Sequence, residues 1–156
     1  MFRVALLSDT HSLLRPEAIE FVRGSDHIVH GGDIGDAGVL EALRRVAPVT
    51  AVRGNNDFGP WAEKIGETEL LKIGEVSIYV LHDLKQLSLD PAAAGFQVVV
   101  SGHSHQPRID ERDGVLYVNP GSCGPRRFKL PISVGELRIS RKSATPKLVE
   151  LKLAGA

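Results

Sequence analysis

Short runs of apolar residues, each followed by a polar turn, recur along the first two thirds of the chain. VALLS at residues 4–8 leads into Asp9, and FQVVV at 96–100 leads into SGHSH. HIVH from residue 27 and PVTAV from residue 48 end in similar turns. Runs of four to eight apolar or β-branched residues bounded by turn residues are typical of buried strands. The pattern therefore predicts a sheet with strands that end in polar loops.

Between these strands the apolar spacing changes to that of helices. Residues 15–24 have Pro16 near the start and Gly24 at the end, which are common boundary residues of a helix. Residues 37–46 repeat their apolar side chains at the spacing of an amphipathic helix that packs on a sheet. We also expect a short helix in PAAAG, residues 91–95.

The second half of the chain has the sequence pattern of β-hairpins. Residues 106–122 surround Asp113-Gly114, a strong signal for a tight turn between two strands. Residues 68–83 and 133–152 are expected to form two further pairs of strands. Alternating strands and helices followed by hairpins predict an α/β protein with mixed sheets and helices on the outside.

Composition indicates one globular domain over residues 1–156. With 42% hydrophobic and 24% charged residues, the chain can bury a core without disulfides. Lys plus Arg equals Asp plus Glu at 19 each, which argues against a nucleic-acid or anionic-membrane binder but permits a small phosphorylated substrate. The single Cys123 suits a reducing compartment. Because no signal-peptide core or membrane-spanning run is visible, we expect a cytoplasmic protein.

Side chains of the types that can bind metal ions follow nearly every strand expected in the first two thirds of the chain. They are Asp9, His11, Asp33, Asn55, His82, His103 and His105. Side chains at the carboxyl ends of strands can converge on one crevice even when they are distant in sequence. Alone, Asp9 is more often a turn residue and His82 more often a core histidine. Together they favour a metal site, since four of the six histidines belong to the set.

The donor types narrow the chemistry of that site. Imidazoles, carboxylates and an amide without thiolate suit Mn, Fe, Ni, Co or Zn, and they argue against a structural zinc knuckle. Seven donors are enough for two ions if one carboxylate bridges them. Paired ions of this kind are the usual machinery for displacement at phosphorus.

The motifs D-x-H, G-D, G-N-x-D, a lone His and G-H-x-H occur here in that order. From residue 4 to about 122 the chain therefore resembles the calcineurin-like metallophosphoesterase superfamily. Its length and the NPGS motif at 119–122 resemble the small bacterial and archaeal YfcE-like phosphodiesterases. The resemblance implies a two-sheet β-sandwich flanked by helices, in four layers α/β/β/α, with the metal site at one edge.

The resemblance also implies roles for the seven residues. One ion would be held by Asp9, His11 and His105 and the other by Asn55, His82 and His103, with Asp33 as the bridge. Asp33, Asn55 and His103 would also take part in catalysis. Independently, residues i and i+2 of an extended segment point the same way, so His103 and His105 can each reach the crevice. The implied cofactors are two divalent ions, with Mn ahead of Ni, Fe, Co or Zn.

The implied activity is hydrolysis of a small phosphodiester by a hydroxide that the metal ions hold. One alternative is a non-catalytic protein-binding scaffold, like the retromer subunit of the same superfamily. The complete set of seven donors argues against a scaffold, because a non-catalytic protein does not need to keep every metal-binding residue. A nuclease is disfavoured by the zero net charge. We expect no binding to a membrane. A homo-oligomer is compatible with the sequence.

Two positions depart from the common superfamily pattern. Asn56 stands where histidine is usual, and it cannot deliver a proton to a leaving group. Asp83 stands where glycine is usual, and we interpret it as solvated in preference to tuning His82. Of the remaining residues, His30 is expected to pack or to support the site, and Asp57 to orient a turn or a ligand.

Overall fold

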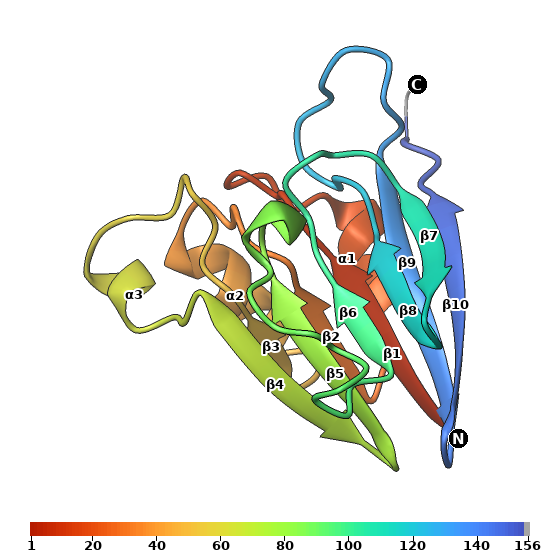
Figure 1. The fold of residues 1–156 in the computed structure, drawn as a ribbon. Coiled ribbons are helices and arrows are strands. Elements are labelled where there is room, and N and C mark those ends of the chain that lie inside the picture. The colour runs from red at the N-terminus through yellow and green to blue at the C-terminus, as the bar shows by residue number, and fades with distance from the viewer. Residues whose placement is uncertain (155–156) are drawn as a thin grey trace.

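The computed structural model describes residues 1–154 and contains two five-stranded sheets (Figure 1). The first sheet has the order β10-β9-β1-β2-β3, formed by β1 (Phe2–Leu7), β2 (His27–His30), β3 (Val49–Ala51), β9 (Ser133–Ser140) and β10 (Ser143–Glu150). The second has the order β4-β5-β6-β8-β7, formed by β4 (Thr68–Ile73), β5 (Val76–Leu81), β6 (Val98–Val100), β7 (Arg108–Arg112) and β8 (Val115–Asn119). The predicted α/β fold with two mixed sheets is confirmed.

Strand direction brings the loops that carry the candidate residues to one edge. In the first sheet β1, β2 and β3 are parallel, while β9 and β10 run antiparallel as a hairpin. In the second sheet β5, β6 and β8 are parallel, and β4 and β7 pair antiparallel at its two edges. The parallel strands of each sheet therefore end on the same side, where their loops can meet.

Alternation along the strands builds three apolar layers. On β1, Val4 and Leu6 belong to the core between the sheets, which also contains Ile78 of β5. Ala5 and Leu7 face the other way, toward α1 (Pro16–Val22) and α2 (Ala37–Arg44). Figure 1 shows these two helices on the outer side of the first sheet.

The outer face of the second sheet is covered differently. Its buried residues include Tyr79 and Val99, which pack against Phe96 and against Leu84 of the short 3₁₀ helix η1 (Leu84–Gln86). The helix expected at 91–95 is a turn, closed by a hydrogen bond from the Phe96 N–H to the Pro91 carbonyl. Five residues offer too few intrahelical hydrogen bonds to repay helix nucleation.

A single helical turn, α3 (Pro60–Glu63), follows the loop after β3. No apolar periodicity in the sequence indicated it.

Cys123, the only cysteine in the sequence, is fully buried among the apolar residues between the first sheet and the helices. Burial raises the pKa of its thiol to about 12. Of the helices in residues 1–154, not one has the length and apolar character needed to cross a membrane.

Candidate metal centre

The seven candidate residues lie in loops that follow five strands. Asp9 and His11 come after β1, Asp33 after β2, Asn55 after β3, His82 after β5, and His103 and His105 after β6. Backbone φ is positive, between 46° and 71°, at Asp9, His11, Asp33, His103 and His105. This left-handed region is costly for residues other than glycine, and such strain gathers at functional sites.

Asp9, His11 and His105 form the first of two groups of potential ligands. His105 Nε2 lies 3.4 Å from Asp9 Oδ1, and His11 Nε2 lies 3.9 Å from the same oxygen. The two imidazole Nε2 atoms are 3.3 Å apart. One ligand atom from each residue lies within 4.8 Å of the others, which is close enough for one ion to contact all three.

Asp9, Asp33 and His82 form the second group. His82 Nε2 lies 3.3 Å from Asp33 Oδ2 and 3.9 Å from Asp9 Oδ1. Asp33 Oδ2 is also 3.8 Å from His11 Nε2, which belongs to the first group. Asp9 is the member common to both groups. Asp33 Oδ2 reaches both His82 and His11, so Asp33 is also in a position suited to a bridging carboxylate.

Buried polar atoms that lack a hydrogen-bond partner show whether these residues are suited to binding a cation. Within residues 1–154, Asp9 Oδ1, His82 Nε2 and His105 Nδ1 are buried side-chain atoms without a hydrogen-bond partner. Buried polar atoms are almost always paired, so Asp9 Oδ1 and His82 Nε2, which lie 3.9 Å apart, indicate a missing partner between them. His105 faces Asp9 with Nε2, so its unpaired Nδ1 does not add to this observation. A divalent cation is a suitable partner, because carboxylate oxygens and imidazole nitrogens are its usual ligands.

Neighbouring groups already direct two of the free atoms, those of His82 and Asp9, into the cluster. His82 Nδ1 lies 2.7 Å from the Gly31 carbonyl, which can only accept, so Nδ1 carries the proton and Nε2 offers its lone pair. Asp9 Oδ2 accepts hydrogen bonds from Ser8 Oγ at 2.7 Å and from the His103 N–H at 3.1 Å, which leaves Oδ1 free. A Cβ at Gly102 would collide with both Ser8 Oγ and Asp9 Oδ2.

The electrostatics of the cluster favour positive charge between the side chains. Burial acts to raise the pKa of Asp33, but the His82 side chain and hydrogen bonds from Asn56 outweigh it and hold the pKa well below its usual range. Burial acts to lower the pKa of His82, but Asp33, Asp9 and the Gly31 carbonyl outweigh it and raise the pKa. Either a proton or a metal ion can supply the positive charge that the carboxylates attract.

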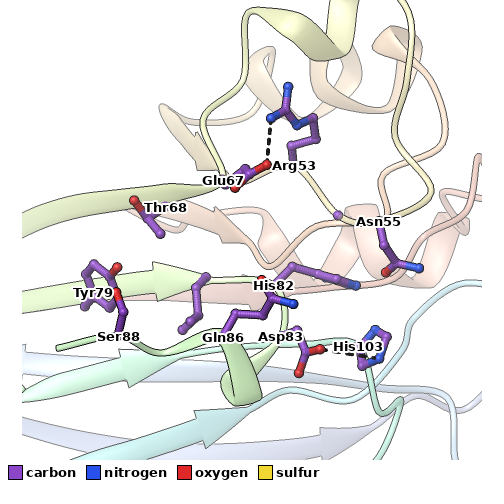
Figure 2. A pocket seen from close by; sticks show the side chains of 12 residues that line it. Arg53, Asn55, Glu67, Thr68, Tyr79, His82, Asp83, Gln86, Ser88 and His103 are labelled. Carbon is purple, nitrogen blue, oxygen red and sulfur yellow. Dashed lines mark hydrogen bonds and ion pairs between the residues drawn. The ribbon is translucent and has the colours of Figure 1, made fainter. Parts of the chain in front are cut away.

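Asn55 and His103 lie outside both groups, at the rim. Together with His82 they line a pocket of about 330 Å³. Figure 2 shows these three residues at one end of this pocket, with Tyr79 and Ser88 at the other. His103 Nε2 lies 3.8 Å from Asp83 Oδ2. The structure thus brings five predicted residues into a tight cluster and places two beside it.

Asp57 and His30 support the loops of the site. The Asp57 carboxylate accepts hydrogen bonds from the backbone N–H groups of Ile34, Gly35 and Gly54 at 2.9–3.1 Å. His30 is fully buried, and its Nε2 lies 3.0 Å from Thr10 Oγ1. Burial lowers the pKa of His30 to about 4, so the imidazole is neutral at pH 7.

Sequence reasoning missed two supporting contacts. Ser8 holds Asp9, as described above, and Asn119 Nδ2 donates to the Gly102 carbonyl at 2.9 Å and to Ser104 Oγ at 3.1 Å. Ser8 ends an apolar run and gives no separate signal. Asn119 begins the NPGS motif, so its position was visible while its role was not.

Comparisons with known proteins identify the family and the fold. The model of the calcineurin-like phosphoesterase superfamily domain matches residues 2–142. A probable metallophosphoesterase of Methanocaldococcus jannaschii is 36% identical over 133 residues, covering 76% of this chain and 67% of that protein. A phosphodiesterase of the same organism is 28% identical over 139 residues, covering 78% and 84%. The fold is similar to that of Vps29 from Chaetomium thermophilum, with a TM-score of 0.78 at 15% identity over 97% of each chain.

Proposed function

Because this chain belongs to the calcineurin-like phosphoesterase superfamily, we propose that it is a phosphodiesterase that works with two divalent metal ions. The observation that carries the proposal is the pair of buried, unpaired atoms Asp9 Oδ1 and His82 Nε2, 3.9 Å apart, beside the Asp33 carboxylate. The Nε2 atoms of His11 and His105 also lie within 3.9 Å of Asp9 Oδ1. Such a cluster of unpaired groups is costly in a protein that binds nothing there. The relative named a phosphodiesterase supports the class of substrate.

Each residue is assigned to a position in this centre. One ion is held by Asp9, His11 and His105 and the other by Asn55, His82 and His103, with Asp33 shared between them. Manganese is our first candidate, with Ni, Fe, Co or Zn as alternatives. When bound, such a pair of ions supplies Lewis acidity and an activated water for attack on phosphorus.

The chain's own residues then orient the reaction. The Gly31 carbonyl fixes the ring of His82, and Asn56 fixes Asp33. His103 and Asn55 lie at the pocket rim, where a phosphoryl group can reach them. Because the Asn56 amide faces Asp33, it is not free to help a departing group, and an amide cannot deliver a proton. Esters with acidic leaving alcohols are therefore the favoured substrates, since general acid catalysis is typically worth ~10²–10⁴-fold for poor leaving groups.

A protein-binding scaffold of the same fold is the alternative. The likeness to Vps29 concerns the fold alone, because the sequence identity is low. A scaffold does not need a buried bridging carboxylate whose two oxygens both accept hydrogen bonds, as those of Asp33 do. The complete set of donors supports the enzyme over the scaffold.

The test is Asp33→Asn, assayed on bis(p-nitrophenyl) phosphate with added manganese. A neutral amide bridges two cations poorly, so we expect at least one ion to be lost and activity to fall more than ~100-fold. Asp36→Asn is the matched control, because Asp36 is an exposed residue that caps α2 and asparagine caps equally well. It should retain both ions and full activity.

Elemental analysis of the purified proteins decides the outcome. Retention of two ions by Asp33→Asn, with activity within a few-fold of the native protein, would contradict the bridging role. Native protein that binds metal and hydrolyses no phosphodiester would favour the scaffold.

A further inference from the structure

Two pockets open on either side of one pair of residues. The pocket of about 330 Å³ that contains His82 and Asn55 is also lined by Asp83 and His103. A second pocket, of about 400 Å³, reaches the opposite way toward Tyr117 and shares the same two residues. A diester has two ester groups, so with its phosphorus near His103 each arm would have one of these pockets beside it.

The Asp83 carboxylate is held in place at the junction of the pockets. Its Oδ1 accepts a hydrogen bond from the Lys85 N–H at 3.0 Å and caps η1, while its Oδ2 lies 3.8 Å from His103 Nε2. Figure 2 shows Asp83 and His103 facing each other at this end of the first pocket. The side chain is 26% exposed, so a substrate that reaches His103 meets it.

Within residues 1–154, no Lys or Arg side chain forms an ion pair with the Asp83 carboxylate. Arg53 is paired with Glu67 at 3.0 Å in the first pocket. In the second pocket Arg108 and Arg112 both pair with Asp110. Lys85 lines the second pocket as well, but among residues 1–154 the only ionisable partner within 4.0 Å of the Asp83 carboxylate is His103.

Building on the proposed function, we propose that Asp83 makes the site selective for phosphodiesters by repelling the second negative charge of a phosphate monoester. Above its second pKa a monoester is a dianion, whereas a diester is a monoanion. A fixed carboxylate at the junction therefore disfavours binding of the monoester dianion more strongly than binding of the diester monoanion. One unit charge several ångströms away near a protein surface corresponds to about a tenfold change in an equilibrium constant.

The substitution Asp83→Asn separates this effect from the capping role. Asparagine accepts the Lys85 hydrogen bond as well as aspartate does and has the same shape, so only the charge is removed. Asp90→Asn is the matched control. Asp90 is exposed, lines neither pocket, and its side chain accepts from the Ala92 N–H at 3.1 Å in the same way.

The first measurement is the ratio of kcat/KM for p-nitrophenyl phosphate to that for bis(p-nitrophenyl) phosphate. Asp83→Asn should raise this ratio about tenfold, and added salt should shrink the difference between variant and native protein. Asp90→Asn should leave the ratio unchanged. An unchanged ratio in Asp83→Asn, with diester hydrolysis intact, would overturn the charge role and leave the proposed function standing.

The second measurement does not depend on turnover. Calorimetry of the metal-loaded proteins compares inorganic phosphate, as the dianion, with dimethyl phosphate, as the monoanion. Asp83→Asn should tighten phosphate binding about tenfold and change dimethyl phosphate binding little. If metal content falls in Asp83→Asn, the residue is a ligand and the proposal is wrong. If native protein hydrolyses neither ester, the proposed function fails, and the two dissociation constants still decide the role of Asp83.

Discussion

Asn56 orients the carboxylate at the centre of the site. Its backbone N–H donates to Asp33 Oδ1 at 2.9 Å, and its side-chain Nδ2 donates to Asp33 Oδ2 at 3.0 Å. Both carboxylate oxygens are thereby fixed in direction before any cation arrives. Partners of this kind restrict how a ligand can turn, which is why their loss weakens metal binding. The residue that departs from the common family pattern thus has a positioning role here.

Asn56→Ala should weaken metal binding by about 10–100-fold, because one of the two hydrogen bonds that orient Asp33 is removed. The backbone donor stays, so the fold should be retained. Dissociation constants from competition with a metal-binding dye provide the measurement. Phe58→Ala is the control in the same loop, since that side chain is 73% exposed. Equal metal affinity in Asn56→Ala and native protein would show that the amide does not hold Asp33.

Between elements, Asp57 joins the loop after β2 to the loop after β3. Two of its three backbone donors, Ile34 and Gly35, belong to the first loop, and Gly54 belongs to the second. The side chain is only 5% exposed, so water cannot replace these partners. Because the same loops carry Asp33 and Asn55, Asp57 sets the distance between two proposed ligands.

Asp57→Asn should destabilise the metal-free protein by about 2 kcal/mol, because an amide group must turn its own N–H toward backbone donors. Metal affinity should fall as well. Asp36→Ala is the comparison, since it removes only the cap of α2 and should cost about 1 kcal/mol without changing metal affinity. Urea unfolding with a chelator present measures both. A loss of stability without any change in metal affinity would separate Asp57 from the site.

The elements that sequence predicted well are those with a long or repeated signal. The hairpin around Asp113-Gly114 formed as expected, and both residues have the positive φ that a tight two-residue turn requires. The helix predicted at 91–95 is wrong and α3 was not predicted, because four or five residues carry no usable periodicity.

For the site, strand ends and motif order predicted which side chains would come near one another. They could not predict that Asn56 binds Asp33 or that Asp83 faces His103. Those contacts depend on side-chain direction in loops with positive φ, and apolar patterning does not encode it.

At the scale of the whole molecule, an ion network far from the site joins sheet and helix layers. Arg3 of β1 pairs with Glu136 of β9 at 2.8 Å, and Arg138 pairs with the other oxygen of Glu136 at 2.8 Å. Arg3 also donates to the carbonyls of Phe21 and Arg23, near the end of α1. Burial acts to raise the pKa of Glu136, but the two guanidinium groups outweigh it and lower the pKa.

Acid should therefore remove a stabilising contribution from Glu136. Its folded pKa lies below the usual 4.5, so the contribution is complete above about pH 4.5 and is lost as pH falls through the lower, folded value. Glu136→Gln should lower the urea midpoint near pH 7, and the gap to native protein should close in acid. Glu150→Gln, an exposed change on β10, should show no such dependence. A gap that stays constant with pH would contradict the ion network.

The burial of Cys123 makes the molecule convenient for attaching reporters. A thiol with a pKa of about 12 and no exposed surface does not react with maleimides while the fold is intact. A cysteine introduced at the pocket rim, such as Ser88→Cys, would then be the single labelled position. A fluorophore attached there would follow ligands as they enter and leave, in real time and without any chemical turnover.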